Sequence, residues 1–487
     1  MNRALVEGMA VELAPAQLGA PALSRLAGAL ERVIFFSLLA LIPLSAVPYG
    51  TVEPWWQALF ECVVFLLAVL WIVEGWLSGA WQISNWKLFL PLFALVIFAW
   101  LQTLPLGGAN EVEGIQSTFW HALSADPYNT RRFALKLLAL IFAGLLLLRY
   151  TTRPNRVRGL VLVILGTGVT SALFGLLRQT IQTDATGFIL PYLPLDSGYG
   201  QFINRNHFAF LMELTLGLTL GLMLGGDRNR ERWLSYAAVS VPLWLALVLS
   251  NSRGGLFSML CLGLFVAWLR QSARSEQLRR TRLVRAALAL CLLAVLIAGS
   301  VWVGGDPLVS RLETVSDEVT SPTQAGVRRT EVWRATWNLI EDHWLAGVGF
   351  GGYWAAIPEY HYASGQLIPQ EAHNDYLEIL ASGGVIGAGL FAWFVLAFVR
   401  CARRRLRHAE AWQRAARLGA LAGLFAVAVH SFFDFGLHIT ANALIATALA
   451  VIAVRDDEAS EDWQKTSLSG QGKFLNWAPG ETIKSSG

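Results

Sequence analysis

The chain has 487 residues, of which 55% are hydrophobic and only 15% are charged. Its mean hydropathy of +0.48 excludes a soluble enzyme of several domains, because such a protein carries more charge and fewer apolar residues. The net charge of +4 is small and unevenly distributed, so it indicates membrane topology and not nucleic-acid binding.

Apolar segments recur along the chain, and most are long enough to cross a hydrocarbon core of about 30 Å as a helix. We therefore expect an all-α polytopic membrane protein of about twelve transmembrane helices. The predicted spans are residues 33–47, 59–77, 88–104, 133–148, 157–177, 208–224, 234–249, 255–269, 286–303, 384–399, 418–433 and 439–454.

The spans divide the chain into five regions. We expect residues 1–32 to form a cytoplasmic head and residues 33–303 to contain spans one to nine. Residues 304–383 form one large periplasmic segment that carries candidate site residues, and residues 384–454 contain spans ten to twelve. The polar residues 455–487 are expected to be a disordered cytoplasmic tail.

Arginines concentrate in the connections at 149–158, 228–232, 270–285 and 400–417. These connections are two spans apart, or a multiple of two, so all of them lie on one side of the membrane. Cytoplasmic loops hold the excess of Lys and Arg, which predicts a bacterial inner-membrane protein with both termini in the cytoplasm.

Polar motifs on the opposite side are not explained by topology and therefore indicate function. They lie at residues 126–132 (DPYNTRR), 204–207 (NRNH), 250–255 (SNSRGG) and 328–378, which includes GVGFGGY at 347–353 and EAHNDYLE at 371–378. The glycine-rich sequence superficially resembles a dinucleotide loop, but no strand precedes it. We expect a tight turn that ends the amphipathic segment 328–344.

Arg253 and His373 are the candidates for chemistry. Arg253 lies between two apolar segments, where an arginine is costly unless it faces an anionic partner or a watery cavity; the alternative is that it extends to the membrane interface. His373 lies near the start of a predicted helix, which favours a neutral ring that accepts a proton. A lone histidine is more often structural, and we assign His207 and His430 to paired structural roles.

Together these motifs resemble the O-antigen ligase and polymerase superfamily of integral-membrane glycan transferases. The resemblance covers roughly residues 54–399 and is most specific from Arg329 to Glu378. It implies transfer of a glycan from an undecaprenyl-diphosphate carrier to an acceptor sugar hydroxyl at the periplasmic face. The acceptor is a lipid A-core in the ligase branch and a growing glycan in the polymerase branch.

The resemblance also implies residue roles. His373 is expected to be the general base, or to orient the acceptor hydroxyl, and Arg253 to stabilise the diphosphate leaving group. The expected substrate-binding residues are Arg131, Arg178, Arg205, Arg329, Asn374 and Asp375. No cofactor and no metal are expected, because the ligase branch implies none and the sequence shows no dense carboxylate cluster.

Three alternatives remain open at this stage. Ligation is placed ahead of chain polymerisation, although the two branches share the Arg and His pattern. A transporter of lipid-linked glycans would use the same arginines, but no inverted repeat is evident. A purely structural membrane protein would leave the outer Arg and His residues unexplained.

Overall fold

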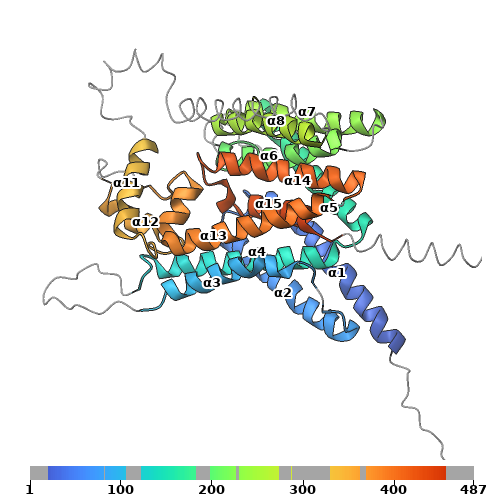
Figure 1. Ribbon diagram of the computed structural model, residues 1–487, viewed down its shortest axis with the longest axis horizontal. Coiled ribbons are helices and arrows are strands. Elements are labelled where there is room, and N and C mark those ends of the chain that lie inside the picture. Colours follow the sequence, from blue (N-terminus) through green and yellow to red (C-terminus); the bar gives the residue numbers. More distant parts are fainter. Residues whose placement is uncertain are drawn as a thin grey trace, which may run out of the picture.

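The computed structural model describes residues 20–81, 83–105, 122–181, 198–225, 230–273, 287, 329–361, 369–407 and 409–456. Within these ranges the regular elements are all helices, which lie mostly side by side along the long axis of the molecule (Figure 1). They are α1 (Ala20–Ala46), α2 (Pro54–Ser78), η2 (Trp86–Phe89), α3 (Leu90–Gln102), α4 (Pro127–Tyr150), α5 (Pro154–Ile181), α6 (Arg205–Gly225), α7 (Arg230–Leu249), α8 (Arg253–Ala273), α11 (Arg329–Asp342), α12 (Tyr353–Ala356), η3 (Ile357–Glu359), α13 (Asp375–Arg407), α14 (Ala411–His430), η4 (Gly436–His438) and α15 (Thr440–Val454).

The predicted all-helical membrane architecture is confirmed for these residues. Seven described helices, α1, α2, α4, α5, α6, α7 and α13, are long and apolar enough to cross a membrane. Shorter apolar helices cover Trp86–Gln102, Arg253–Ala267 and Thr440–Val454. The predicted ninth span, 286–303, falls almost wholly outside the described residues, so the number of twelve spans stays a prediction.

Large apolar side chains point outward from several helices. Phe36, Trp76 and Leu162 are 63%, 80% and 66% exposed, and they belong to α1, α2 and α5. Isolated exposed apolar residues are normal, but many of them along long apolar helices are expected only when lipid is the surrounding solvent. The outer surface of the bundle therefore agrees with membrane insertion.

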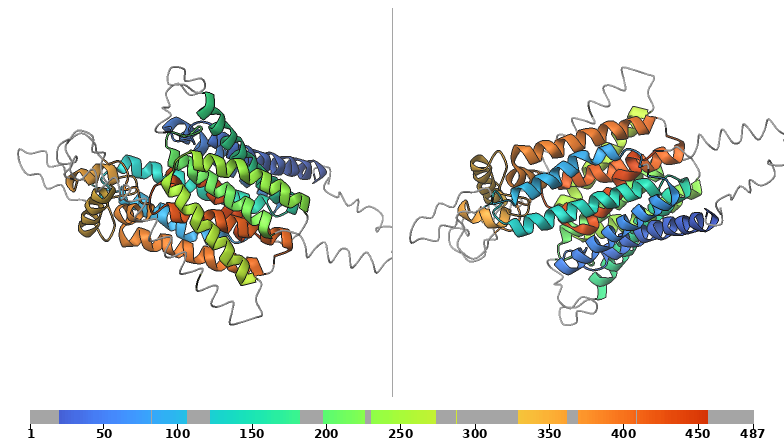
Figure 2. Two further views of the ribbon diagram at one scale, coloured as in Figure 1. Left: turned by 90° about the horizontal axis from the view of Figure 1, so that it is seen from above. Right: turned by 90° about the horizontal axis from the view of Figure 1, so that it is seen from below.

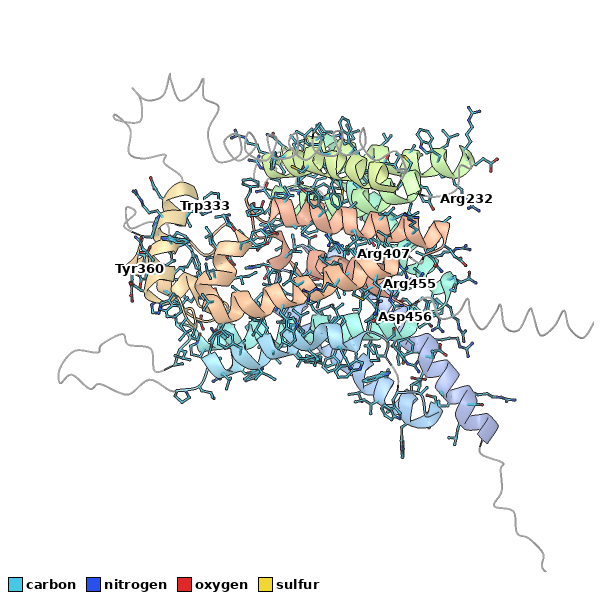
Figure 3. The ribbon with its side chains drawn as sticks, in the orientation of Figure 1. Arg232, Trp333, Tyr360, Arg407, Arg455 and Asp456 are labelled. Atoms are coloured by element: carbon cyan, nitrogen blue, oxygen red, sulfur yellow. The ribbon has the colours of Figure 1, made fainter. Side chains whose placement is uncertain are left out.

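The two ends of the bundle differ in charge. Arg417 near the start of α14 donates hydrogen bonds to the carbonyl oxygens of Arg405 and Arg455, at 2.6 and 2.9 Å. The end of α13, the start of α14 and the end of α15 therefore meet. Figure 3 shows Arg232, Arg407 and Arg455 at this arginine end, and Trp333 and Tyr360 at the other, which we call the distal end.

Helix α6 is largely buried and packs closely against α14 in the interior of the bundle. A Cβ atom added at Gly217 would lie 2.3 Å from the Cα of Gly423, and one at Gly221 would lie 2.1 Å from the Cα of Gly419. Small residues spaced by four allow the backbones of membrane helices to approach in this way. Two further views show the same bundle from above and below (Figure 2).

The glycine-rich sequence forms a turn after α11, as predicted, and docks onto α13. Gly347 has a φ of 68°, and the amides of Val348 and Gly349 donate to the carbonyl oxygens of Ala381 and Ser382 at 3.0 and 2.9 Å. Helix α13 begins at Asp375, earlier than the predicted span at 384, and bends at Gly384, where φ is 58°. The first part of α13 thus belongs to the distal end.

Candidate functional site

Four segments converge at the distal end around the carboxylate of Asp434, which is fully buried. They are the starts of α6 and α8, the connection from α14 to η4, and the segment just before α13. A carboxylate in such a place requires hydrogen-bond donors or positive charge, because an isolated buried charge is costly.

Hydrogen bonds link three of these segments through Asn206. Its side-chain amide donates to Asp434, and its Oδ1 accepts a hydrogen bond from Ser252 Oγ at 2.8 Å. Ser252 Oγ in turn accepts from the amide of Gly255 at 3.1 Å and so caps the start of α8. The NRNH and SNSRGG motifs, which are far apart in the sequence, are joined here.

Two histidines face the same carboxylate. His373 Nδ1 lies 3.7 Å from Asp434 Oδ1, and His207 Nε2 lies 3.9 Å from it. The ring of Phe435 lies against both histidines, with centroid distances of 5.1 and 4.9 Å. The His373 side chain is 38% exposed and that of His207 only 8%, so a ligand can reach His373 much more easily.

Backbone geometry sets the position of His373. Its φ of 50° is unusual for a residue other than glycine, and it precedes α13 instead of lying on the helix. Strained backbone of this kind is concentrated at functional sites. Asn374 follows it and caps α13, accepting hydrogen bonds from the amides of Tyr376 and Leu377 at 3.0 and 3.1 Å.

Two of the predicted arginines flank the network. Arg205 is the first residue of α6 and adjoins Asn206, and Arg253 is the first residue of α8 and adjoins Ser252. Both are exposed. Helix N-termini favour anions, so an exposed arginine at each of two such ends is well placed for a phosphate group.

The other predicted residues are more scattered. Arg131 is exposed near the start of α4, whereas Arg178 is only 4% exposed and donates to the carbonyl oxygen of Gly200 at 2.6 Å. Arg329 begins α11, and its side chain lies outside the described part of the chain. Asp375 begins α13 and turns toward His438. Their roles in substrate binding stay predictions.

The structure corrects the sequence-based expectation that the protein has no dense cluster of carboxylates. Glu371, Asp375 and Glu378 all face the ring of His438, at distances of 3.4 to 3.8 Å. Burial by itself raises the pKa of Glu371, but the facing imidazole of His438, a hydrogen bond with Glu378 and the nearby His373 together outweigh burial and lower this pKa to about 2. Burial likewise lowers the pKa of His438, yet Glu371 and Asp375 outweigh it and the net direction is upward. We expected no metal for two reasons, the family resemblance and the lack of a carboxylate cluster, and the second reason no longer holds.

A further ionisable pair lies deeper in the bundle. His430 Nδ1 lies 2.7 Å from Glu213 Oε1, and both side chains are almost fully buried. Phe210 stacks on the His430 ring at 4.3 Å, and a Cβ atom added at Gly254 would come within 2.5 Å of His430 Nε2. The pair connects α6 to α14 and agrees with a structural role for His430.

Sequence analysis assigned no role to Glu213 or Asp434 as site residues, although each interrupts an apolar region. An ionisable residue at membrane depth is by itself a signal of function. The contact of Glu371 and Glu378 with His438 was not predictable in the same way, because most of α13 and all of α14 separate His438 from them in the sequence.

Comparison with known proteins gives one match. Residues 238–392 match the family model described as O-Antigen ligase. The matched stretch includes Arg253, α11, the glycine-rich turn and His373, and it confirms the resemblance to the O-antigen ligase and polymerase superfamily. No curated protein matches the chain.

Proposed function

We propose that this protein transfers a glycan from an undecaprenyl-diphosphate carrier to an acceptor sugar hydroxyl at the periplasmic face of the inner membrane. The observation that carries this proposal is the convergence of His373, Arg205 and Arg253 around the Asp434 network at the distal end. The family match over 238–392 supports the same class of reaction.

His373 acts as the general base in this mechanism. Asp434 faces Nδ1 of the ring at 3.7 Å, so a slight closure would make a hydrogen bond from Nδ1–H to the carboxylate. That bond would leave Nε2 without a proton and able to accept one from the acceptor hydroxyl. Catalytic hydrogen bonds are often long before substrate binds, so the open distance is compatible with this role.

Arg205 and Arg253 bind the diphosphate. The acceptor oxygen attacks the anomeric carbon, the bond from that carbon to the phosphate oxygen breaks, and the proton passes to His373. Negative charge develops on the departing lipid diphosphate, and a planar guanidinium stabilises it through two parallel hydrogen bonds. A single displacement of this kind inverts the anomeric centre.

We place ligation to a lipid A-core ahead of polymerisation of the glycan chain. The test is transfer by the purified full-length protein in nanodiscs, given a carrier-linked glycan with or without a lipid A-core acceptor. Ligation predicts product only when the core acceptor is present. Chain growth without the core would instead assign the protein to the polymerase branch, and movement of intact donor across the bilayer without transfer would favour a transporter.

A further inference from the structure

Arg253 begins α8 and Asp434 follows α14, and one buried residue contacts both of their segments. This residue is His430, which ends α14 and is 1% exposed. Its carbonyl oxygen accepts hydrogen bonds from the amides of Phe433 and Asp434 at 2.8 and 3.2 Å. The connection that carries Asp434 therefore begins with a turn that closes on His430.

The ring of His430 lies against the start of α8. A Cβ atom added at Gly254, the neighbour of Arg253, would lie 2.5 Å from Nε2 of His430. A Cβ atom added at Gly255 would lie 2.8 Å from the Cβ of Ala209 on α6. The two glycines of the SNSRGG motif thus let α8 begin in direct contact with the imidazole and with α6. The imidazole therefore limits where the backbone at Arg253 can lie.

Residues of α6 and α8 hold this imidazole in place. Glu213 Oε1 lies 2.7 Å from Nδ1 of His430, and the ring of Phe210 stacks on the imidazole at 4.3 Å. Ser258, a fully buried residue of α8, also interacts with the Glu213 carboxylate through its side chain. Breaking a hydrogen bond in so dry a place leaves a costly unpaired group, so the ring has little freedom to shift.

A role limited to joining α6 and α14 does not explain this pair. The contacts of Gly217 with Gly423 and of Gly221 with Gly419 already hold the two helices together. Apolar side chains often stabilise a buried contact as well as an ionisable pair does, and ionisable residues inside membrane proteins are generally kept for function. What distinguishes His430 is its simultaneous contact with the segments of Arg253 and Asp434.

We propose that the Glu213–His430 pair sets the spacing between Arg253 and Asp434. Its effect on the transfer rate rests on the proposed function, in which Arg253 binds the leaving diphosphate and Asp434 orients the base. The spacing of the two segments then determines the distance between leaving group and base, and a misplacement of about 1 Å can lower a rate about 100-fold. Glu213 and His430 act through these other residues, so both are positioning residues.

Hydrogen exchange of the full-length protein in nanodiscs tests the positioning without any glycan donor. His430→Asn keeps a donor for Glu213 but is too short to reach Gly254. We expect it to speed amide exchange in residues 250–257 and 431–436 about 10-fold or more, because both segments lose the same support. Glu213→Gln should act in the same direction but less strongly. Exchange in α2 and α4 should stay as in wild type.

Glu74→Gln is the matched control. Glu74 is also a buried carboxylate, but it accepts a hydrogen bond from Tyr150 at 3.1 Å and joins the end of α2 to the end of α4. This variant should leave exchange in residues 250–257 and 431–436 unchanged. The proposal would be overturned by unchanged exchange in both His430→Asn and Glu213→Gln, or by equal acceleration throughout the chain, which would indicate a general loss of stability.

Transfer rates test the contact between His430 and Gly254 in a second way. Alanine at 254 suits a helical backbone but would meet the imidazole, so Gly254→Ala should lower the rate at saturating donor about 10- to 100-fold. In His430→Ala protein the space is free, so adding Gly254→Ala should change the rate less than about 2-fold. Losses that multiply would contradict positioning through this contact. Absence of transfer by wild type would contradict the proposed function, whereas the exchange rates would still decide whether the pair positions the two segments.

Discussion

His373 and His207 face the same carboxylate but differ in what else can reach them. Both lie within 4 Å of Asp434, yet the His207 side chain is almost buried and His373 is partly open. A general base must contact both the group that orients it and the proton that it removes. Only His373 meets both conditions here, so its removal should affect the chemical step more than donor binding.

We expect His373→Ala to lower the transfer rate about 100-fold to 10,000-fold, the usual contribution of general-base catalysis. Donor affinity, measured separately in nanodiscs, should change little. His361→Ala is the control, because His361 lies beyond η3 and outside the Asp434 network, and His207→Ala should have a smaller effect. A normal rate at saturating donor with weakened donor binding would make His373 a diphosphate ligand instead.

Substitutions of Arg253 test whether transfer requires the planar shape of the guanidinium as well as its charge. Lysine keeps the charge but replaces the planar fork by a single ammonium group, so it loses paired hydrogen bonds to phosphate. We expect Arg253→Lys to lose most transfer activity and Arg253→Ala nearly all, with normal membrane abundance. Arg230→Lys, an exposed change at the start of α7, is the control. Wild-type activity of Arg253→Ala would exclude the residue from the site.

At the scale of helices, the position of the site depends on how closely α6 and α14 approach. The start of α6 carries Arg205 and Asn206, and Asp434 lies just beyond the end of α14. A large side chain inserted between these two helices would therefore separate Asn206 from Asp434. The contact between Gly221 and Gly419 leaves no space for a side chain.

We expect Gly221→Leu to destabilise the protein and abolish transfer, because overpacking at a backbone contact forces the helices apart. Thermal unfolding in detergent should occur at a clearly lower temperature than in wild type. Gly166→Leu on α5 is the matched control, since a Cβ atom added there meets nothing within 4 Å. Equal stability of the two variants would contradict the close packing of α6 on α14.

Hydropathy and segment length predicted the long apolar helices well, because lipid requires long apolar segments whatever their partners. The motifs containing Arg253 and His373 were predictable for a similar reason, since topology did not explain their polarity. The bend at Gly384 and the convergence on His438 were not predictable. They depend on contacts between segments far apart in the chain, which a single sequence does not contain.

For the whole molecule, the separation of charge between its ends determines which face the site occupies. Arg232, Arg407 and Arg455 lie at the arginine end, and Trp333 of α11 lies at the distal end (Figure 3). The Asp434 network belongs to the distal end, because Trp333 donates a hydrogen bond to the carbonyl oxygen of Ala372, next to His373, and packs with Phe433, next to Asp434. The excess of arginine marks the cytoplasmic side in bacterial membranes. The site should then open to the periplasm, where lipid-linked glycans are presented after they cross the bilayer.

Reporter fusions measure this orientation directly. We expect alkaline phosphatase fused after Tyr360 to be active, because Tyr360 lies at the distal end and the enzyme folds only outside the cytoplasm. Phosphatase fused after Arg407 should be inactive, whereas green fluorescent protein fused at the same two positions should fluoresce only after Arg407. Using both reporters at each position separates orientation from poor expression. The reverse pattern would place the Asp434 network in the cytoplasm, where the periplasmic glycan transfer proposed for it could not take place.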